Sequence, residues 1–129
     1  MKLDYDFIKQ ILLTMEDYDK HEIENFELMK RLDITNDNED KFIGHILILG
    51  DNGFIDSSNL KHPYGFARIS RGDVYQIIND NYRITAHGYD FLDILKNDTV
   101  LNKIKNFAIK NAWEIGKQLI IESAKINML

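Results

Sequence analysis

The block from Tyr82 to Leu92 constrains the fold of this chain more than any other stretch. It opens with alternating polar and apolar residues, which is typical of a short strand. Thr85 can then cap a helix that carries Tyr89, Leu92 and Leu95 on one face. The block therefore predicts a strand that passes directly into a helix.

A matching half lies upstream, where helical spacing predicts a helix from about Glu39 to Leu49. Gly50 or Gly53 would stop this helix, and a strand would start at Phe54. The order helix, glycine stop, hairpin and return through Ile-Thr-x-x-Gly resembles the recognition helix, wing and following helix of a winged-helix domain. The expected fold is therefore α+β and mostly helical.

Periodicity and composition predict the remaining elements. Apolar spacing indicates a helix capped by Asp4 and a second helix over residues 22–32, whose early part could instead be a strand. A β-rich segment precedes the turn signal at residues 79–81, so we expect a hairpin between residues 74–78 and 82–84.

The end of the chain is predicted to be helical. A helix should start near residues 97–99, with an apolar stripe of Val100, Ile104, Phe107 and Ala108. A further helix follows, with a break near Asn111. We expect residues 1–97 to form a winged helix-turn-helix domain with a small antiparallel hairpin. Residues 98–129 would form a C-terminal helical extension of the same compact unit.

Composition limits the functional classes. The chain has no Cys, which excludes disulfides and thiolate metal sites, and no apolar run approaches the roughly 20 residues that a membrane helix needs. Acidic residues at positions 4 and 6 stand where a signal peptide would be apolar, so a cytoplasmic location is expected. The pI of about 5.3 disfavours non-specific binding of polyanions, although a local basic patch is compatible with DNA binding.

Several motifs resemble an uncharacterised bacterial and phage-associated winged-helix family, domain of unknown function 2513. The most specific block spans residues 84–103 and includes Ile84-Thr85, Gly88, Asp90-Phe91-Leu92-Asp93, Asp98-Thr99 and Asn102-Lys103. Ile11-Leu12-Leu13, His45, Leu49, Gly53 and Ile55 match earlier motifs. The chain departs from the family pattern at Tyr89 and Leu101, which replace a His and a Trp. The resemblance implies a fold and a phage or prophage context, but no activity.

The helix over residues 39–50 supplies the first candidate site. His45 is expected on the side away from Phe42, together with Lys41, Gly44 and Ile48, facing solvent or a groove. A base or phosphate contact is one interpretation, with Gly44 allowing close approach. An ordinary exposed or packing histidine is the other, and it is favoured because this face has no Arg, Asn or Gln.

The expected wing supplies the second candidate site. Lys61, Arg68 and Arg71 form the best basic patch of the chain, with aromatic residues between them. Such a patch can hold phosphates, and it can equally be a solvated loop.

The last segment carries more apolar residues than one helix face uses. Trp113, Leu119 and Ile120 are among them, and a helix that is apolar all round is buried or paired. Packing across the core is one interpretation. A homodimer seam is the favoured one, because a small core has little spare surface to cover two faces.

Catalytic and metal-binding patterns are weak. The four His residues never have the spacing of two ligands on one helix, and there is no phosphate-cradling glycine loop. We therefore expect no enzyme activity, no metal and no cofactor. The leading hypothesis is a DNA-binding or regulatory module that binds double-stranded DNA, and the alternative is an adapter that binds a protein partner.

Overall fold

The fold begins with a helix whose start is fixed by an aspartate. In the computed structural model, which describes residues 1–69 and 75–127, α1 runs over Tyr5–Asp17. The Asp4 carboxylate accepts a hydrogen bond from the backbone N–H of Phe7 at 3.0 Å, as expected of an N-cap. The helix and its cap are those that the sequence predicts. The apolar face is buried and comprises Ile8, Ile11, Leu12 and Met15.

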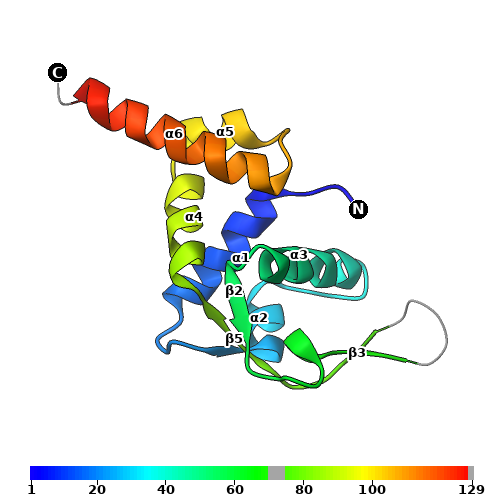
Figure 1. Cartoon of the computed structure of the whole chain (residues 1–129). Helices are drawn as coiled ribbons and strands as arrows, with labels where there is room; N and C mark the ends of the chain where they lie inside the picture. The colour runs from blue at the N-terminus through cyan, green and yellow to red at the C-terminus, as the bar shows by residue number, and fades with distance from the viewer. Residues whose placement is uncertain (70–74, 128–129) are drawn as a thin grey trace.

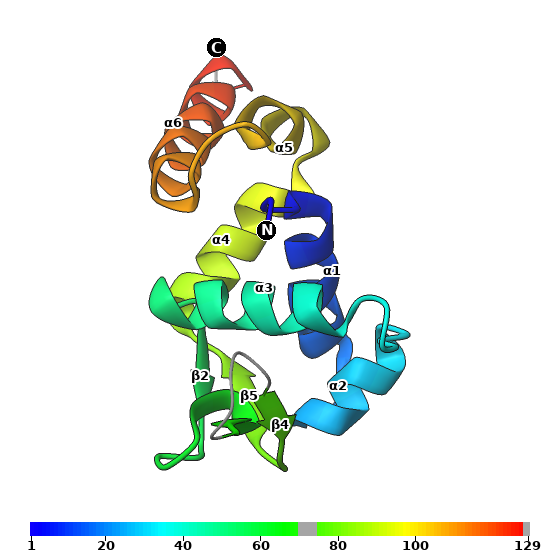
Figure 2. The same ribbon diagram turned by 90° about the vertical axis from the view of Figure 1, so that its right-hand side faces the viewer.

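Two helices and a short strand follow. β1 (Ile23–Glu24) leads into α2 (Asn25–Arg31), so the 22–32 segment contains both elements that its pattern allowed. α3 covers Glu39–Asp51, close to its predicted bounds, and Gly53 follows with a φ of 73°. Glycine adopts this left-handed conformation without strain, which suits it to the end of a helix. Figure 2 shows α3 crossing the molecule in front of α1, with most of α4 above α3 and the strands below it.

A small antiparallel sheet joins distant parts of the chain. β2 (Ile55–Ser57) and β1 flank β5 (Asn81–Ile84), in the order β1-β5-β2. The two segments that the sequence paired do meet: the Thr85 hydroxyl donates a hydrogen bond to the Gly53 carbonyl at 2.5 Å. The Thr85 N–H also bonds to the Phe54 carbonyl at 3.1 Å. This contact brings the end of α3 beside the start of α4.

A two-stranded hairpin projects from this sheet. It consists of β3 (Phe66–Arg68), which follows the short 3-10 helix η1 (Pro63–Gly65), and of β4 (Tyr75–Ile77). The expected pairing of residues 74–78 with 82–84 is wrong, because β4 pairs with β3 while β5 lies between β1 and β2. Figure 1 shows this hairpin extending from the molecule on the same side as α3.

Buried polar groups explain why the segment at residues 79–81 is not a hairpin turn. Asp80 is only 3% exposed, and its carboxylate accepts hydrogen bonds from the Ser58 hydroxyl and the Asn59 and Asn81 N–H groups at 2.8–2.9 Å. Its backbone carbonyl accepts from the Asn25 N–H at 2.9 Å. We call the following polar cluster the hairpin base: Asn25, Ser57, Tyr64, Asp80 and Tyr82.

Close packing at the hairpin base depends on one glycine. Gly65 has a φ of 78°, and a Cβ there would lie 2.1 Å from the Ile78 carbonyl oxygen. Tyr64 precedes it with a φ of 65°, and its carbonyl accepts a hydrogen bond from the Tyr82 hydroxyl at 2.5 Å. Burial raises the pKa of Tyr82, so the phenol remains a hydrogen-bond donor.

The helix after Thr85 packs directly against Phe54, the residue before β2. α4 covers Ala86–Lys96, and the Thr85 hydroxyl caps it by accepting from the Gly88 N–H at 3.0 Å. A Cβ at Gly88 would lie 1.9 Å from the Phe54 carbonyl oxygen. The Thr-x-x-Gly pattern therefore combines a cap with a close helix–strand contact. Leu92 and Leu95 are buried as predicted, but Tyr89 is 46% exposed.

Two helices complete the described chain. α5 (Asp98–Ile104) is capped by the Asn97 side chain, and α6 covers Ile109–Asn127. The break therefore lies before Ile109 rather than near Asn111. Phe107 falls in this break and is 41% exposed, so it does not extend the buried stripe of α5. None of the helices in the described ranges is long and apolar enough to span a membrane.

Candidate functional site

The outward face of α3 carries an apolar centre between acidic ends. Asp40 and Asp51 are exposed, whereas Leu47 and Ile48 between them are half-buried. The opposite side of α3 is anchored in the core by Phe42, Ile43, Ile46 and Leu49. We call the surface formed by the following residues the α3 face: Asp40, Gly44, Leu47, Ile48 and Asp51.

His45 does not belong to this face. It is fully buried, so the expectation that it faces solvent or a groove is wrong. Position 45 lies three residues after Phe42 and four before Leu49, which places all three on one side of a helix. The start of α1 covers this side, and the ring of Phe7 lies edge-on to the His45 ring at 5.3 Å.

The hydrogen bonds of His45 define its protonation state. The Asp4 N–H donates to Nε2 at 2.9 Å, so Nε2 must be unprotonated. Nδ1 then carries the proton and donates it to the Lys41 carbonyl at 2.7 Å. Burial lowers the pKa of His45, in agreement with a neutral ring. The side chain thus connects α1 to α3, and no ring nitrogen remains for a ligand.

Lys41 is also engaged within the chain. Its ammonium lies 2.6 Å from an Asp4 carboxylate oxygen and 4.9 Å from the centre of the Phe7 ring. Partial burial acts to raise the pKa of Asp4, but hydrogen bonds from Lys41 and the Phe7 N–H and the nearby positive charge outweigh it and lower the pKa. We call the following group the helix junction: Asp4, Phe7, Lys41 and His45.

The first residues of the chain lie against Gly44. A Cβ at this position would be 2.4 Å from the Met1 sulfur. Close approach at Gly44 is therefore used by the chain itself in this structure, rather than being open to a ligand. The side chain of Met1 is 67% exposed, so it covers Gly44 from the solvent side.

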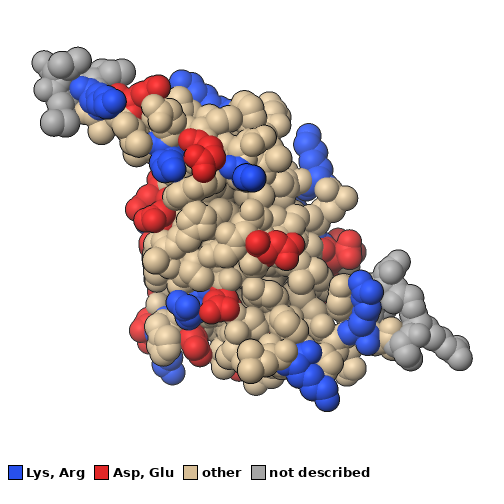
Figure 3. Space-filling view, viewed as in Figure 1, with Lys and Arg blue, Asp and Glu red and all other residues tan. Residues whose placement is uncertain are grey.

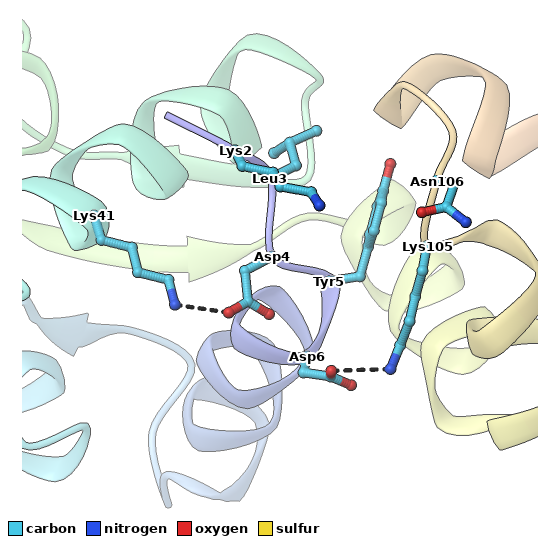
Figure 4. Close-up of a pocket in the computed structure, with 8 residues that line it drawn as sticks. All are labelled: Lys2, Leu3, Asp4, Tyr5, Asp6, Lys41, Lys105 and Asn106. Carbon is cyan, nitrogen blue, oxygen red and sulfur yellow. Dashed lines mark hydrogen bonds and ion pairs between the residues drawn. The ribbon is translucent and has the colours of Figure 1, made fainter.

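A hollow beside the helix junction holds several charges (Figure 4). Asp4 points to Lys41, and Asp6 points to Lys105, with an N···O distance of 3.0 Å for the second pair. The Tyr5 hydroxyl donates to the Phe107 carbonyl, and burial raises its pKa to about 12. These contacts join the start of α1 to α3 and to the α5–α6 connection. Because Lys41 and Lys105 each pair with a carboxylate of the chain, the charges of this hollow serve to hold these segments together.

The predicted basic residues of the hairpin are only partly described. Lys61 and Arg68 are exposed, and the guanidinium of Arg68 lies 5.8 Å from the centre of the Tyr75 ring across the hairpin. Arg71 lies outside the described residues. On the face shown in Figure 3, Lys and Arg form separate spots among acidic and uncharged side chains rather than a continuous band.

A family model described as "Hypothetical protein (DUF2513)" matches residues 2–114. The chain belongs to this family. The match includes α1 to α5, the helix junction and the hairpin base, whereas most of α6 lies outside it. No curated protein matches the chain, and neither does any solved structure.

Trp113 is near the end of the DUF2513 match. Its ring contacts His87 at 4.4 Å and lies 6.4–6.5 Å from Phe91 and Phe54, so it packs within the chain. Leu119 and Ile120, the other residues predicted for a dimer seam, lie beyond the matched range and are half-buried. The aromatic cluster anchors α6 on α4 and on Phe54, the residue before β2.

Sequence reasoning did not identify the two polar clusters. Asp4 was predicted as a cap, but no local pattern connects it to Lys41 and His45, which lie 37 and 41 residues away. Asn25 and Asp80 are 55 residues apart and looked like ordinary polar residues of a helix and a turn. The described residues contain no group of three His, Cys, Asp or Glu side chains that could hold a metal ion.

Proposed function

We propose that this chain is a winged helix-turn-helix module. The order α1-β1-α2-α3-β2-hairpin-β5 supports this, as does the central position of β5 between β1 and β2. In this proposal, α3 is the recognition helix, the β3–β4 hairpin is the wing, and the Gly53–Thr85 contact holds the wing segment at the end of α3.

We further propose that the module acts as an adapter, without catalysis, and that its α3 face binds a protein partner. The observation that carries this proposal is the chemistry of the face: Leu47 and Ile48, which also pack against the core, leave the uncovered part of their apolar side chains between the exposed acids Asp40 and Asp51. Apolar surface at the centre of a polar rim is the usual arrangement of a protein interface. A recognition helix for DNA would instead offer cations or amides to phosphates and base edges.

Electrostatics also favours a protein partner for α3. Lys41 is the single Lys or Arg in Glu39–Asp51, all of which the structure describes, and it is bound to Asp4. Glu39 and Asp40 at the start of α3 would repel a phosphate backbone. Engaging DNA through this helix would therefore require a charge balance opposite to the one that α3 carries.

Site-specific photo-crosslinking tests the proposal. A photoreactive amino acid at Leu47, introduced in cells that express the protein, should form a covalent adduct with a partner protein. The same group at Lys103, an exposed position on α5, is the matched control. With the photoreactive group at Asp51, the added change Ile48→Glu should abolish the adduct. Identical adduct patterns at positions 47 and 103, or adducts with nucleic acid alone, would contradict an adapter role of the α3 face.

DNA binding through the wing is a second candidate. It is favoured by the exposure of Lys61 and Arg68 on or beside the hairpin, and the family resemblance suggests a phage or prophage setting. Fluorescence anisotropy with duplexes from the genomic neighbourhood of the gene would test it. The combined change Arg68→Ala and Arg71→Ala should reduce the slope of log K against log salt by about two units if each contacts a phosphate. Lys20→Ala, on the α1–β1 connection, should leave the slope unchanged.

A further inference from the structure

A groove between α4 and α6 combines an apolar floor with an acidic wall. It has a volume of about 320 Å³. Asp90 and Asp93 of α4, both exposed, line one side, and Lys117 of α6 lines the other. Its apolar lining consists of Ile94, Trp113, Ile120 and Ile121.

The shape of this groove follows from the close approach of the two helices. A Cβ at Gly116 would lie 2.5 Å from the Ile94 Cγ2 atom, so glycine allows α6 to pack tightly on α4. Figure 1 shows the second half of α6 continuing beyond α4, away from the rest of the molecule. Ile121 lies in this half and is 42% exposed. The helix therefore carries a partly exposed apolar residue at the edge of the groove.

The exposed side of α6 complements the groove in charge. Lys117, Ile121 and Lys125 are each four residues apart, which places them in one row along the helix, and all three are exposed. This row has an apolar residue between two cations. The groove has an apolar floor beside the two carboxylates of α4, and it shares Lys117 and Ile121 with the row. Lys117 also lies 3.5 Å from a Glu114 carboxylate oxygen, whereas no ion pair to Asp90 or Asp93 is formed within the described chain, so these two carboxylates can meet the cations of a second copy.

We propose that two copies of this chain form a dimer in which α6 of each copy lies in the α4–α6 groove of the other. A single surface that carries both the row and the groove is self-complementary, which is the requirement for a two-fold symmetric interface. Asp90 and Asp93 of one copy then face Lys117 and Lys125 of the other. The Ile121 side chains of both copies become buried in the interface. This dimer does not involve the α3 face.

Charge reversal with rescue tests this arrangement. The wild-type chain should be a dimer at micromolar concentration in size-exclusion chromatography with light scattering. The change Asp90→Lys with Asp93→Lys should give a monomer, because the groove then repels the row. The change Lys117→Glu with Lys125→Glu should also give a monomer. An equimolar mixture of the two variants should restore a dimer, because each groove then meets a row of opposite charge.

The controls separate dissociation from misfolding. Circular dichroism should show the same helix content for both variants as for the wild type. The control variant Asp19→Lys with Asp37→Lys changes the net charge by the same amount as Asp90→Lys with Asp93→Lys. Its substitutions are at exposed positions away from the groove, so it should remain dimeric. A monomeric wild type, a groove variant that stays dimeric, or a mixture that stays monomeric would each overturn the proposal.

Discussion

The hairpin base and the helix junction fix the two sides of the molecule in different ways. In the hairpin base, Asn25 is fully buried and Asp80 is 3% exposed, and both use backbone groups as partners. In the helix junction, the side chains of Lys41 and Asp4 remain 42% and 36% exposed, and one partner is a titratable histidine. The buried polar groups of the first cluster have uncharged partners, whereas the second cluster contains a half-exposed ion pair.

The comparison shows how burial sets the energetic weight of a polar contact. A buried polar group that loses its partner costs about 1–3 kcal/mol, whereas a half-exposed ion pair is worth about 0–1 kcal/mol. We therefore expect the buried hydrogen bonds of the hairpin base to hold the β3–β4 hairpin in one orientation. The helix junction should instead respond to pH and salt.

The largest effect is expected for Gly65→Ala, at the glycine that packs against the hairpin base. Alanine would have to adopt the left-handed φ of 78° that Gly65 has, and its Cβ would lie 2.1 Å from the Ile78 carbonyl oxygen. The free energy of unfolding should therefore fall by about 3 kcal/mol or more. Gly53→Ala is the matched control, because Gly53 has a φ of 73° but no atom within 4 Å of the Cβ position. That change should cost about 1–2 kcal/mol in urea unfolding. Equal losses for the two variants would show that packing at the hairpin base is loose.

Asn25→Ala should have the next largest effect. It leaves the Ile78 carbonyl and the Phe26 and Asp80 N–H groups without their side-chain partner, and we expect a loss of about 2–4 kcal/mol. Asn38→Ala removes two hydrogen bonds at the exposed α2–α3 connection and should cost less than about 1 kcal/mol. Urea unfolding of both variants measures the contrast, and similar losses would contradict the role given to burial.

The helix junction should make stability depend on pH. Because folding lowers the pKa of His45 below its usual 6.5, the unfolded chain binds the proton more tightly. The stabilisation of the fold by neutral His45 is present above pH 6.5 and is lost as the pH falls towards the pKa of the folded state. The reason is that a protonated Nε2 cannot accept a hydrogen bond from the Asp4 N–H. The nearby charges are Asp4, which opposes this shift, and Lys41, which adds to it.

Unfolding free energies measured at several pH values between about 5 and 7 test this dependence. His45→Gln should remove the slope in this range. His21→Gln, at a side chain that is 87% exposed, should leave the slope unchanged. If the His45 variant kept the full dependence of unfolding free energy on pH, groups other than His45 would be its cause.

The smallest effect is expected for the Asp4–Lys41 ion pair. Lys41→Met keeps an aliphatic chain over Phe7 and should cost at most about 1 kcal/mol, with a smaller difference in about 1 M salt. Asp4→Asn retains a capping side chain and serves as the second arm of a double-mutant cycle. A coupling energy well above 1 kcal/mol that does not change with salt would mean that this ion pair is as well shielded from solvent as the hairpin base.

Local signals predicted much of the fold. Asp4, Thr85 and Asn97 each cap a helix that starts where the sequence places it, because a cap depends on residues only a few positions away. The stop of α3 before Gly53 also follows from a local backbone preference. The α+β class and the mostly helical content were predicted on the same basis, whereas the DUF2513 family was expected from a resemblance of motifs and is confirmed by the match over residues 2–114.

The candidate site was predicted less well, because exposure depends on what packs over a helix. His45 was expected to face outward, yet the start of α1 covers it. Lys41 and Gly44 lie on α3 as expected, but Asp4 and Met1 occupy them. Leu47 was expected on the apolar face of this helix and Ile48 beside His45 on the opposite one, yet both are half-buried on the same face in the structure.

Most helix starts and the end of α3 follow from the sequence alone, because caps, glycine stops and apolar periodicity act within one or two turns of chain. The pairing of β4 with β3, the burial of Asp80 beneath the hairpin and the hydrogen bond from Asp4 to His45 follow only from the assembled fold. These choices depend on contacts between residues tens of positions apart. Their free energy comes from burial and from satisfying polar groups in the assembled core, which no local segment can provide.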